Sequence, residues 1–146
     1  MTLSEEKVMD IIKDIWFDAN RIYMKTDTGK TFSRPLEAFP LLKEASDKDR
    51  LNFKIGKFGD DVRWESLDED IHISSFFETV EPDYENEIAA IFKRFPQLNV
   101  SEVARSMGIN KSLLSKYIYG IKKPSIQRKM QIKEALHVLG EELIAV

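Results

Sequence analysis

Residues 101–125, SEVARSMGINKSLLSKYIYGIKKPS, decide how the C-terminal part of the chain folds. Asn99 is a good N-cap and predicts a short helix through about Met107, with Ala104 small enough to let a second helix approach closely. Gly108 can adopt the positive φ that ends a helix. The stretch therefore predicts two short helices joined by a tight turn.

The second helix is expected over KSLLSKYIY, after the N-cap Asn110 and before Gly120. At about 100° per residue, the polar side chains fall on one arc of roughly 140°. They are Lys111, Ser112, Ser115, Lys116 and Tyr119. The side chains of the separate apolar arc, expected to pack on the rest of the domain, are Leu113, Leu114, Tyr117 and Ile118.

The polar arc carries two ammonium groups, two hydroxyls and a phenol, and no carboxylate. A face that serves only solubility usually mixes both signs of charge. The major groove of DNA admits one helix, and such side chains can hydrogen-bond base edges and phosphates. The arc therefore favours DNA binding, and the alternative is a helical bundle whose basic face is simply solvated.

The segment LNVSEVARSMGINKSLLSKYIYGIKKPS resembles the helix–turn–helix of the Cro/lambda-repressor family. The positions that match this family's pattern are Ala104, Gly108, Ile109, Leu114, Gly120 and Pro124. The resemblance covers roughly residues 83–146 and implies an all-α domain of about five helices. The first would be capped by Asp83 and run to about Arg94, and the last two would be SIQRKMQIKEALHVLG and EELIAV.

The resemblance also implies which side chains contact DNA. Bases would be read by Lys111, Ser112 and Lys116, with Ser115 and Tyr119 nearby. Phosphates would be contacted from the loops by Asn99, Asn110, Lys122 and Lys123, and Arg105 is expected to neutralise a further phosphate. The chain departs from the family at Val100, where Gln is frequent, and at Ile118, where a Glu often pairs with an Arg.

The N-terminal part, residues 1–80, has the pattern of strands and turns. KVMDIIKDIWF and RIYMK are rich in β-branched and aromatic residues, and DAN and TDTGK are turn signals between strands. EAFPLLKEASDKDRLNF changes to a helical pattern with Ser46 as a plausible N-cap, and FKIGKFGDDVRW and DIHIS return to alternation. These features predict a small α+β domain with a mainly antiparallel sheet.

This part also resembles a small bacterial family known only as a domain of unknown function. The matching residues are Pro35, Leu36, Phe39, Pro40 and Leu42, then Trp64, Leu67, Asp68, Glu69, Asp70 and Ile71. The resemblance runs from about Ile11 to Phe77. It implies a fold and no established activity, although such domains often accompany toxin–antitoxin-like gene pairs or helix–turn–helix regulators.

Charge is segregated along the chain. Residues 1–80 carry 17 acidic and 12 basic side chains, whereas residues 90–133 carry ten basic side chains and a single acid, Glu102. This asymmetry predicts an acidic module joined to one that binds an anion. Zero cysteines, no long apolar run and an acidic N-terminus fit a bacterial-type, cytoplasmic protein that does not cross a membrane.

Catalysis and metal binding are not expected. Asp68, Glu69 and Asp70 are consecutive on an extended segment, where neighbouring side chains point in opposite directions and seldom converge on one ion. The chain has no Cys nucleophile, no Gly-rich phosphate loop and no His pair at metal spacing. His72 and His137 lack an identifiable partner, so we expect no enzyme, no cofactor and no metal.

The sequence thus predicts a sequence-specific DNA-binding transcriptional regulator, in the repressor class, with its DNA-binding domain in residues 83–146. A single small module buries little surface on DNA, so a homodimer on two half-sites is expected. The N-terminal domain could dimerise, sense a ligand or bind a protein partner. The alternative is an antitoxin-like interaction protein, in which that acidic domain neutralises a basic partner and DNA binding is secondary.

Overall fold

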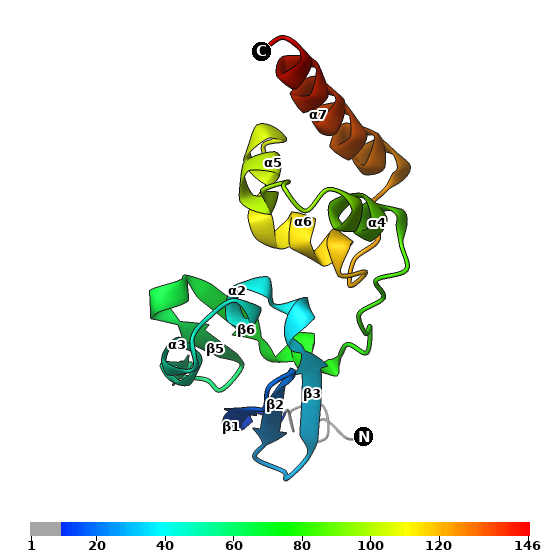
Figure 1. Cartoon of the computed structure of the whole chain (residues 1–146). Coiled ribbons are helices and arrows are strands. Elements are labelled where there is room, and N and C mark those ends of the chain that lie inside the picture. Colours follow the sequence, from blue (N-terminus) through cyan, green and yellow to red (C-terminus); the bar gives the residue numbers. More distant parts are fainter. Residues whose placement is uncertain (1–9) are drawn as a thin grey trace. The chain divides into compact units, whose positions relative to one another are not determined.

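The computed structural model describes residues 10–146. The chain divides into two compact units, Met1–Val80 (unit 1) and Glu81–Val146 (unit 2), and each is described by itself (Figure 1). Unit 1 combines strands with short helices, and unit 2 contains helices, so the chain is α+β as predicted. Among the described residues, no helix is both long enough and apolar enough to span a bilayer.

The first sheet of unit 1 is an antiparallel meander of β1 (Ile12–Phe17), β2 (Arg21–Thr26) and β3 (Thr31–Pro35), in that order. Both turn signals are confirmed, because β1 and β2 join through residues 18–20 and β2 and β3 through residues 27–30. Gly29 occupies the second turn with a φ of 89°, where a side chain would be strained. The first strand was expected to start at Lys7, but residues 7–9 lie outside the described part.

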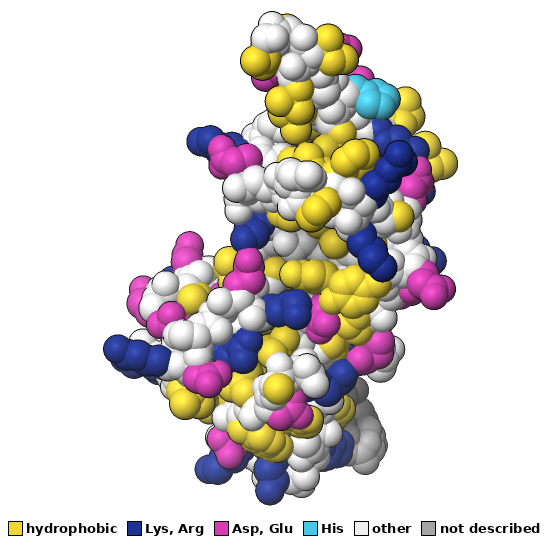
Figure 2. Space-filling model, in the orientation of Figure 1, with side chains coloured by type: hydrophobic (Ala, Val, Ile, Leu, Met, Phe, Trp, Pro, Cys, Tyr) yellow, Lys and Arg dark blue, Asp and Glu magenta, His cyan; other side chains and the backbone are white. Residues whose placement is uncertain are grey.

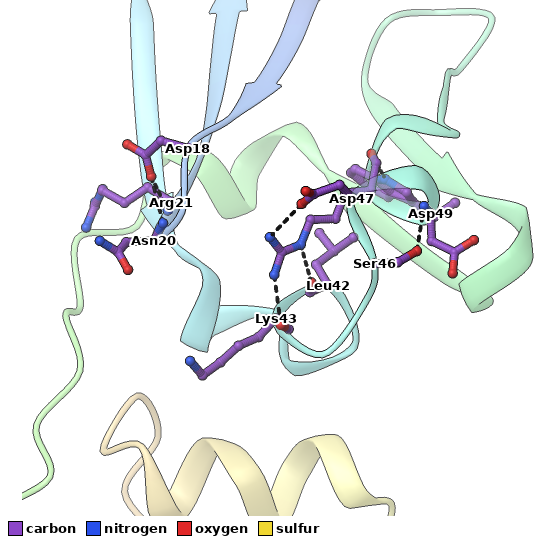
Figure 3. Close-up of polar contacts among 10 residues, drawn as sticks. Asp18, Asn20, Arg21, Leu42, Lys43, Ser46, Asp47 and Asp49 are labelled. Atoms are coloured by element: carbon purple, nitrogen blue, oxygen red, sulfur yellow. Dashed lines mark hydrogen bonds and ion pairs between the residues drawn. The ribbon is translucent and has the colours of Figure 1, made fainter.

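Short helices follow the first sheet: the 3₁₀ turn η1 (Leu36–Ala38), then α2 (Pro40–Lys43) and α3 (Asp47–Leu51). Ser46 caps α3 as predicted, since its hydroxyl accepts from the N–H of Asp49 at 3.1 Å. Arg50 joins the two helices, donating to the carbonyl oxygens of Leu42 and Lys43 at 2.8 Å each; Figure 3 labels these two acceptor residues. The guanidinium thus supplies charged donors to two carbonyls at the end of α2, of which that of Leu42 also accepts from the N–H of Ala45 at 3.2 Å.

The second sheet is also antiparallel and contains β4 (Lys54–Ile55), β5 (Asp61–Trp64) and β6 (Glu69–His72). The 3₁₀ turn η2 (Glu65–Leu67) connects β5 to β6, and η3 (Ile73–Phe77) follows β6. The sequence predicted one small sheet, whereas the structure has two of three strands each. The strand alternation is confirmed for Ile71, which is buried, and for His72, which is exposed.

The core of unit 1 centres on Trp64, whose side chain is fully buried and whose indole N–H donates to the carbonyl oxygen of Arg50 at 2.9 Å. Phe17 and Phe53 contact the indole edge-on and at a tilt. The buried apolar side chains of both sheets and the helices complete the core: Ile12, Ile15, Ile22, Met24, Leu36, Leu42, Val62, Ile71, Ile73 and Phe76. The indole therefore belongs to the core, and its N–H group is hydrogen-bonded, as is usual for a buried tryptophan.

Unit 2 contains α4 (Glu87–Arg94), α5 (Val100–Ser106), α6 (Lys111–Ile118) and α7 (Ile126–Ile144). Two predictions about these helices are wrong. The first helix starts after Asn86, not Asp83, because the Asn86 side chain accepts from the N–H of Ala89 at 2.8 Å. The last two expected helices are one, because α7 runs through Gly140 without a break.

The core of unit 2 is a single cluster to which each of these four helices contributes: Ile88, Val103, Ala104, Leu114, Tyr117 and Ile132. Val103 and Ala104 form the inward face of α5, and Ala104 lies where another helix approaches closely, as expected. Met107 and Ile109 pack against the cluster from the turn between α5 and α6. Since α6 contributes two fully packed side chains, its orientation about its own axis is fixed by burial.

Candidate nucleic-acid interface

The turn between α5 and α6 has the geometry that the sequence predicted. Asn99 and Asn110 are the N-caps of α5 and α6, and their side-chain oxygens accept from the N–H groups of Glu102 at 3.1 Å and Leu113 at 2.7 Å. Gly108 has a φ of 72°, and the N–H of Ile109 donates to the carbonyl oxygen of Ala104 at 3.1 Å. The cap oxygens are therefore occupied, and contact with a phosphate would fall to the amide nitrogens of both Asn side chains.

α6 packs on the core through Leu114 and Tyr117, which are buried. Ser112 and Lys116 lie on the opposite side of the helix and are only partly covered. The ion pairs formed among residues 10–146 do not include Lys116. This side of α6 thus presents a hydroxyl and an ammonium group to solvent.

One of the predicted base-reading residues, Ser115, is placed differently, and another, Tyr119, contacts an aromatic ring from the segment before α4. Ser115 is buried, with 4% of its surface exposed, so the expectation that its hydroxyl shares the solvent face is wrong. An ideal helical projection put it there, but the core also covers the flank of α6 on which Ser115 lies. Tyr119 is half-buried, and its ring meets that of Tyr84 edge-on with centroids 5.9 Å apart.

The loop after α6 carries an exposed pair of cations, Lys122 and Lys123. Gly120 has a φ of 72°, and the N–H groups of Ile121 and Lys122 both donate to the carbonyl oxygen of Lys116, at 3.0 and 3.2 Å. The helix end and the start of this loop are therefore tied together. Neither lysine takes part in an ion pair within the described residues.

Arg105 is exposed on α5, and its guanidinium forms an ion pair with Glu102 one turn earlier. The positive charge that was expected to neutralise a phosphate is therefore already compensated within the helix. An exposed pair of this kind contributes little to stability and can exchange partners.

The sequence analysis missed how the segment before α4 holds the end of α6. The side-chain amide nitrogen of Asn86 donates to the carbonyl oxygens of Asp83 at 2.8 Å and Ile118 at 3.2 Å. The N–H of Asp83 donates to the carbonyl oxygen of Tyr119 at 2.8 Å. Asn86 and Ile118, and likewise Asp83 and Tyr119, are more than 30 positions apart along the chain, so no local sequence pattern predicts these contacts.

In unit 1, the acidic residues that could suggest a metal site surround Arg63. The guanidinium bonds the carboxylates of Glu65, Asp68 and Asp70 at 2.7, 2.9 and 2.6 Å, and these bonds raise the arginine pKa further. Asp68 reaches the guanidinium because its φ is 50°, which turns its side chain out of the extended pattern. No group of His, Asp and Glu side chains within residues 10–146 is arranged to hold a metal ion.

Acidic and basic side chains are interspersed over the visible face of unit 1 (Figure 2).

The His72 side chain forms a hydrogen bond close by in the sequence, with its Nδ1 accepting from the N–H of Ser74 at 3.1 Å. His137 lies exposed on α7.

The comparison with protein families concerns unit 1. Residues 12–81 match the family described as Protein of unknown function (DUF2442). Residues 12–81 are therefore similar to this family. The match spans both three-stranded sheets and the helices between them, and it supports the resemblance drawn from the Trp and Leu-Asp-Glu-Asp-Ile residues. The family description assigns no activity.

Two solved structures are similar to the chain. A protein of unknown function from Rhodospirillum rubrum is 25% identical over 49% of this chain and 93% of its own, with a TM-score of 0.41. A "Putative DNA Binding Protein" from Nitrosomonas europaea is 12% identical over 85% of this chain and 84% of its own, with a TM-score of 0.35. No curated protein matches the chain significantly.

Proposed function

We propose that unit 2 is a helix–turn–helix module that binds double-stranded DNA, and that the chain is a sequence-specific transcriptional regulator of the repressor class. The observation that carries the proposal is the orientation of α6. Leu114 and Tyr117 hold one side of this helix in the core, and KSLLSKYIY has two ammonium groups and no carboxylate on the rest of its surface. A helix of this kind fits a groove lined with phosphates.

The contacts divide between the helix and the loops around it. Base edges would be read by Lys111, Ser112 and Lys116, with the Tyr119 phenol beside them, oriented by Tyr84. Lys122 and Lys123 would neutralise phosphates, and the amide nitrogens of Asn99 and Asn110 would donate to them. Arg105 contributes least, because Glu102 competes for it. The proposal assigns no catalysis, cofactor or metal.

Selection from random duplexes with the full chain tests this proposal. We expect a preferred sequence to be enriched, and Lys111→Ala and Lys116→Ala to relax the preference at separate positions, by about 1–3 kcal/mol per lost contact. The matched control is Lys48→Ala, an exposed lysine on α3 of unit 1, which should leave the selected sequence unchanged. Absence of duplex binding even at low salt would overturn the proposal.

A second function, binding of a basic protein partner by unit 1, is favoured by one hollow of about 560 Å³ beside the Arg63 cluster. Its lining includes the aromatic rings of Phe53 and Phe58, four carboxylates (Asp60, Asp61, Glu65 and Asp70) and three basic side chains (Lys54, Lys57 and Arg63), so that acids exceed bases by one. Phe58 is 74% exposed. On peptide arrays that vary in charge, basic apolar peptides should be retained and Phe58→Ser should release them. Equal retention of acidic peptides would contradict this role.

A further inference from the structure

A groove of about 610 Å³ runs between α5 and the C-terminal half of α7 in unit 2. Its apolar lining comes from both helices and from the segment before α5: Leu98, Val103, Met107, Ala135, Val138 and Leu139. In Figure 2, hydrophobic side chains are visible on this part of the molecule, along α7 at the top of the view. The residues of the groove leave an apolar surface of the size that binds a side chain or a helix end.

The rim of the groove is acidic. Glu102, Glu134 and Glu142 line it, and its lining includes no lysine or arginine. Glu102 pairs with Arg105, whereas Glu134 and Glu142 form no ion pair with any residue of the described part of the chain. The groove therefore favours an occupant that is apolar and positively charged.

The chain itself carries such a surface at the start of α7. Ile126 and Met130 are 81% and 66% exposed, one helical turn apart. Residues 121–133 contain five basic side chains and no acid, whereas residues 134–146 contain three glutamates and no lysine or arginine. The two halves of α7 are thus opposite in charge, and each has an uncovered apolar surface.

We propose that the occupant of the groove is the start of α7 from a second copy of this chain. Ile126 and Met130 of one copy would lie against Val138, Leu139 and Met107 of the other. This burial removes apolar surface of both copies from water. Arg128 would approach the rim glutamates, so the charges of the two surfaces are complementary.

Each copy makes these contacts with the other, so the assembly is complete with two copies. Each copy then donates one helix start and offers one groove, which is the arrangement of a two-fold dimer. The inference stands on the groove and α7 alone, and does not depend on DNA binding.

Sedimentation equilibrium of the full chain without DNA is the first test. We expect a dimer at micromolar concentration, and we expect Ile126→Glu and Met130→Glu each to raise its dissociation constant at least about tenfold, because each places a carboxylate against the acidic rim. Both residues are exposed in the single copy, so the far-UV circular dichroism should not change. The control is Leu51→Glu, on the exposed surface of unit 1, which should not alter dimerisation.

Several results would overturn the proposal. A wild-type chain that stays monomeric would show that the occupant of the groove is not a second copy. A dimer that tolerates both substitutions but dissociates on Leu51→Glu places the interface in unit 1.

Disulfide trapping gives a test of the contact itself, because the chain has no cysteine. Two single variants, Met130→Cys and Val138→Cys, are purified separately, mixed and oxidised. Each variant carries a single cysteine, so only an intermolecular bond can form. We expect the mixed disulfide in excess of either symmetric one. Predominant Met130→Cys self-linkage would indicate a different pairing of α7 and reject this one.

Discussion

The N–H of Asp83 donates to the carbonyl oxygen of Tyr119 at 2.8 Å and so fixes the segment that enters unit 2 against the end of α6. The contact brings the backbone of Asp83 close to Gly120. A Cβ added at Gly120 would overlap the carbonyl oxygen and the nitrogen of Asp83. Position 120 therefore requires glycine for two reasons: its φ of 72° and the space that Asp83 occupies.

Gly120→Ala should destabilise unit 2 more than Gly108→Ala does. Both glycines have a φ of 72°, but a Cβ at Gly108 would meet no neighbouring atom. The conformational penalty, about 1–2 kcal/mol, is common to both substitutions. Steric overlap at Gly120 should add roughly 1–3 kcal/mol. Urea unfolding followed by far-UV circular dichroism measures the difference.

The two units can be followed separately in that experiment. Both tryptophans, Trp16 and Trp64, belong to unit 1, so their fluorescence should give the same transition in wild type and in both glycine variants. Equal losses of stability for the two variants would show that the contact with Asp83 is not tight enough to exclude a methyl group.

Lys123→Ala should reduce the salt dependence of DNA binding. Each neutralised phosphate releases a counterion, so loss of one lysine contact should reduce the slope of log K against log salt by about one. Lys48→Ala serves as the control for total charge and should leave the slope unchanged. Fluorescence anisotropy with a duplex of the selected sequence gives both slopes, and identical slopes for the two variants would exclude Lys123 as a phosphate contact.

The link between α4 and α7 should weaken in acid. Lys133 donates to the carboxylate of Glu87, and this bond lowers the pKa of Glu87 below its ordinary value of 4.5, with Lys129 adding to the effect. A carboxyl group with a lowered pKa stabilises the fold above its unfolded pKa, and that contribution disappears as the pH falls through the folded pKa. The stability difference between wild type and Glu87→Gln should therefore shrink between about pH 6 and about pH 3.

The control for this pH dependence is Glu85→Gln, an exposed glutamate before α4 that forms no ion pair within residues 10–146. Its difference from wild type should stay nearly constant over the same range. A Glu87→Gln difference that stays constant as well would mean that the ion pair contributes nothing in solution.

Arg50→Ala should destabilise unit 1, whereas Lys48→Ala on the same helix should not. The substitution removes the donors to the carbonyl oxygens of Leu42 and Lys43 and the ion pair with Asp47. A loss of about 1–3 kcal/mol is expected for carbonyls that lose a charged donor. Urea unfolding followed by tryptophan fluorescence reports it, and a loss below about 0.5 kcal/mol would mean that water replaces the guanidinium.

Local chemistry made the caps and turns predictable. Ser46, Asn99 and Asn110 were expected to cap helices, and each does so with its own side chain three residues before the N–H that it accepts. The positive φ of Gly29 and Gly108 follows from turn chemistry in the same way. In each case the interaction lies within a few residues, so the sequence contains all of it.

Tertiary contacts account for the predictions that were wrong. Asp83 and Asn86 are both good capping residues, and a bond to a carbonyl on α6 decides between them. The family resemblance implied a break after Gly140, but one glycine costs a helix only about 1 kcal/mol, and α7 continues through it. For Ser115, the burial of one flank of α6 depends on the packing of whole helices, which a projection of α6 alone does not contain.

The acidic residues around Arg63 in unit 1 also could not be placed from the sequence. Asp70 faces Arg63 because the two residues are paired across β5 and β6, and Asp68 reaches the same guanidinium from the turn before β6, where its φ is 50°. Alternation along one strand predicts which side chains share a face, but it does not predict the opposing residue, Arg63, which comes from the neighbouring strand. The result is a cluster of ion pairs with the guanidinium of Arg63 at its centre.

Arg34 sets the smallest fragment in which unit 1 could be studied alone. Its buried guanidinium donates to the carbonyl oxygens of Glu78 at 3.1 Å and Val80 at 2.8 Å, across the unit from β3. Truncation before Glu78 would remove these two acceptors from a buried guanidinium, whereas a cut after Val80 or Glu81 preserves them. Proteolytic dissection of the two halves should therefore succeed only on the C-terminal side of this anchor.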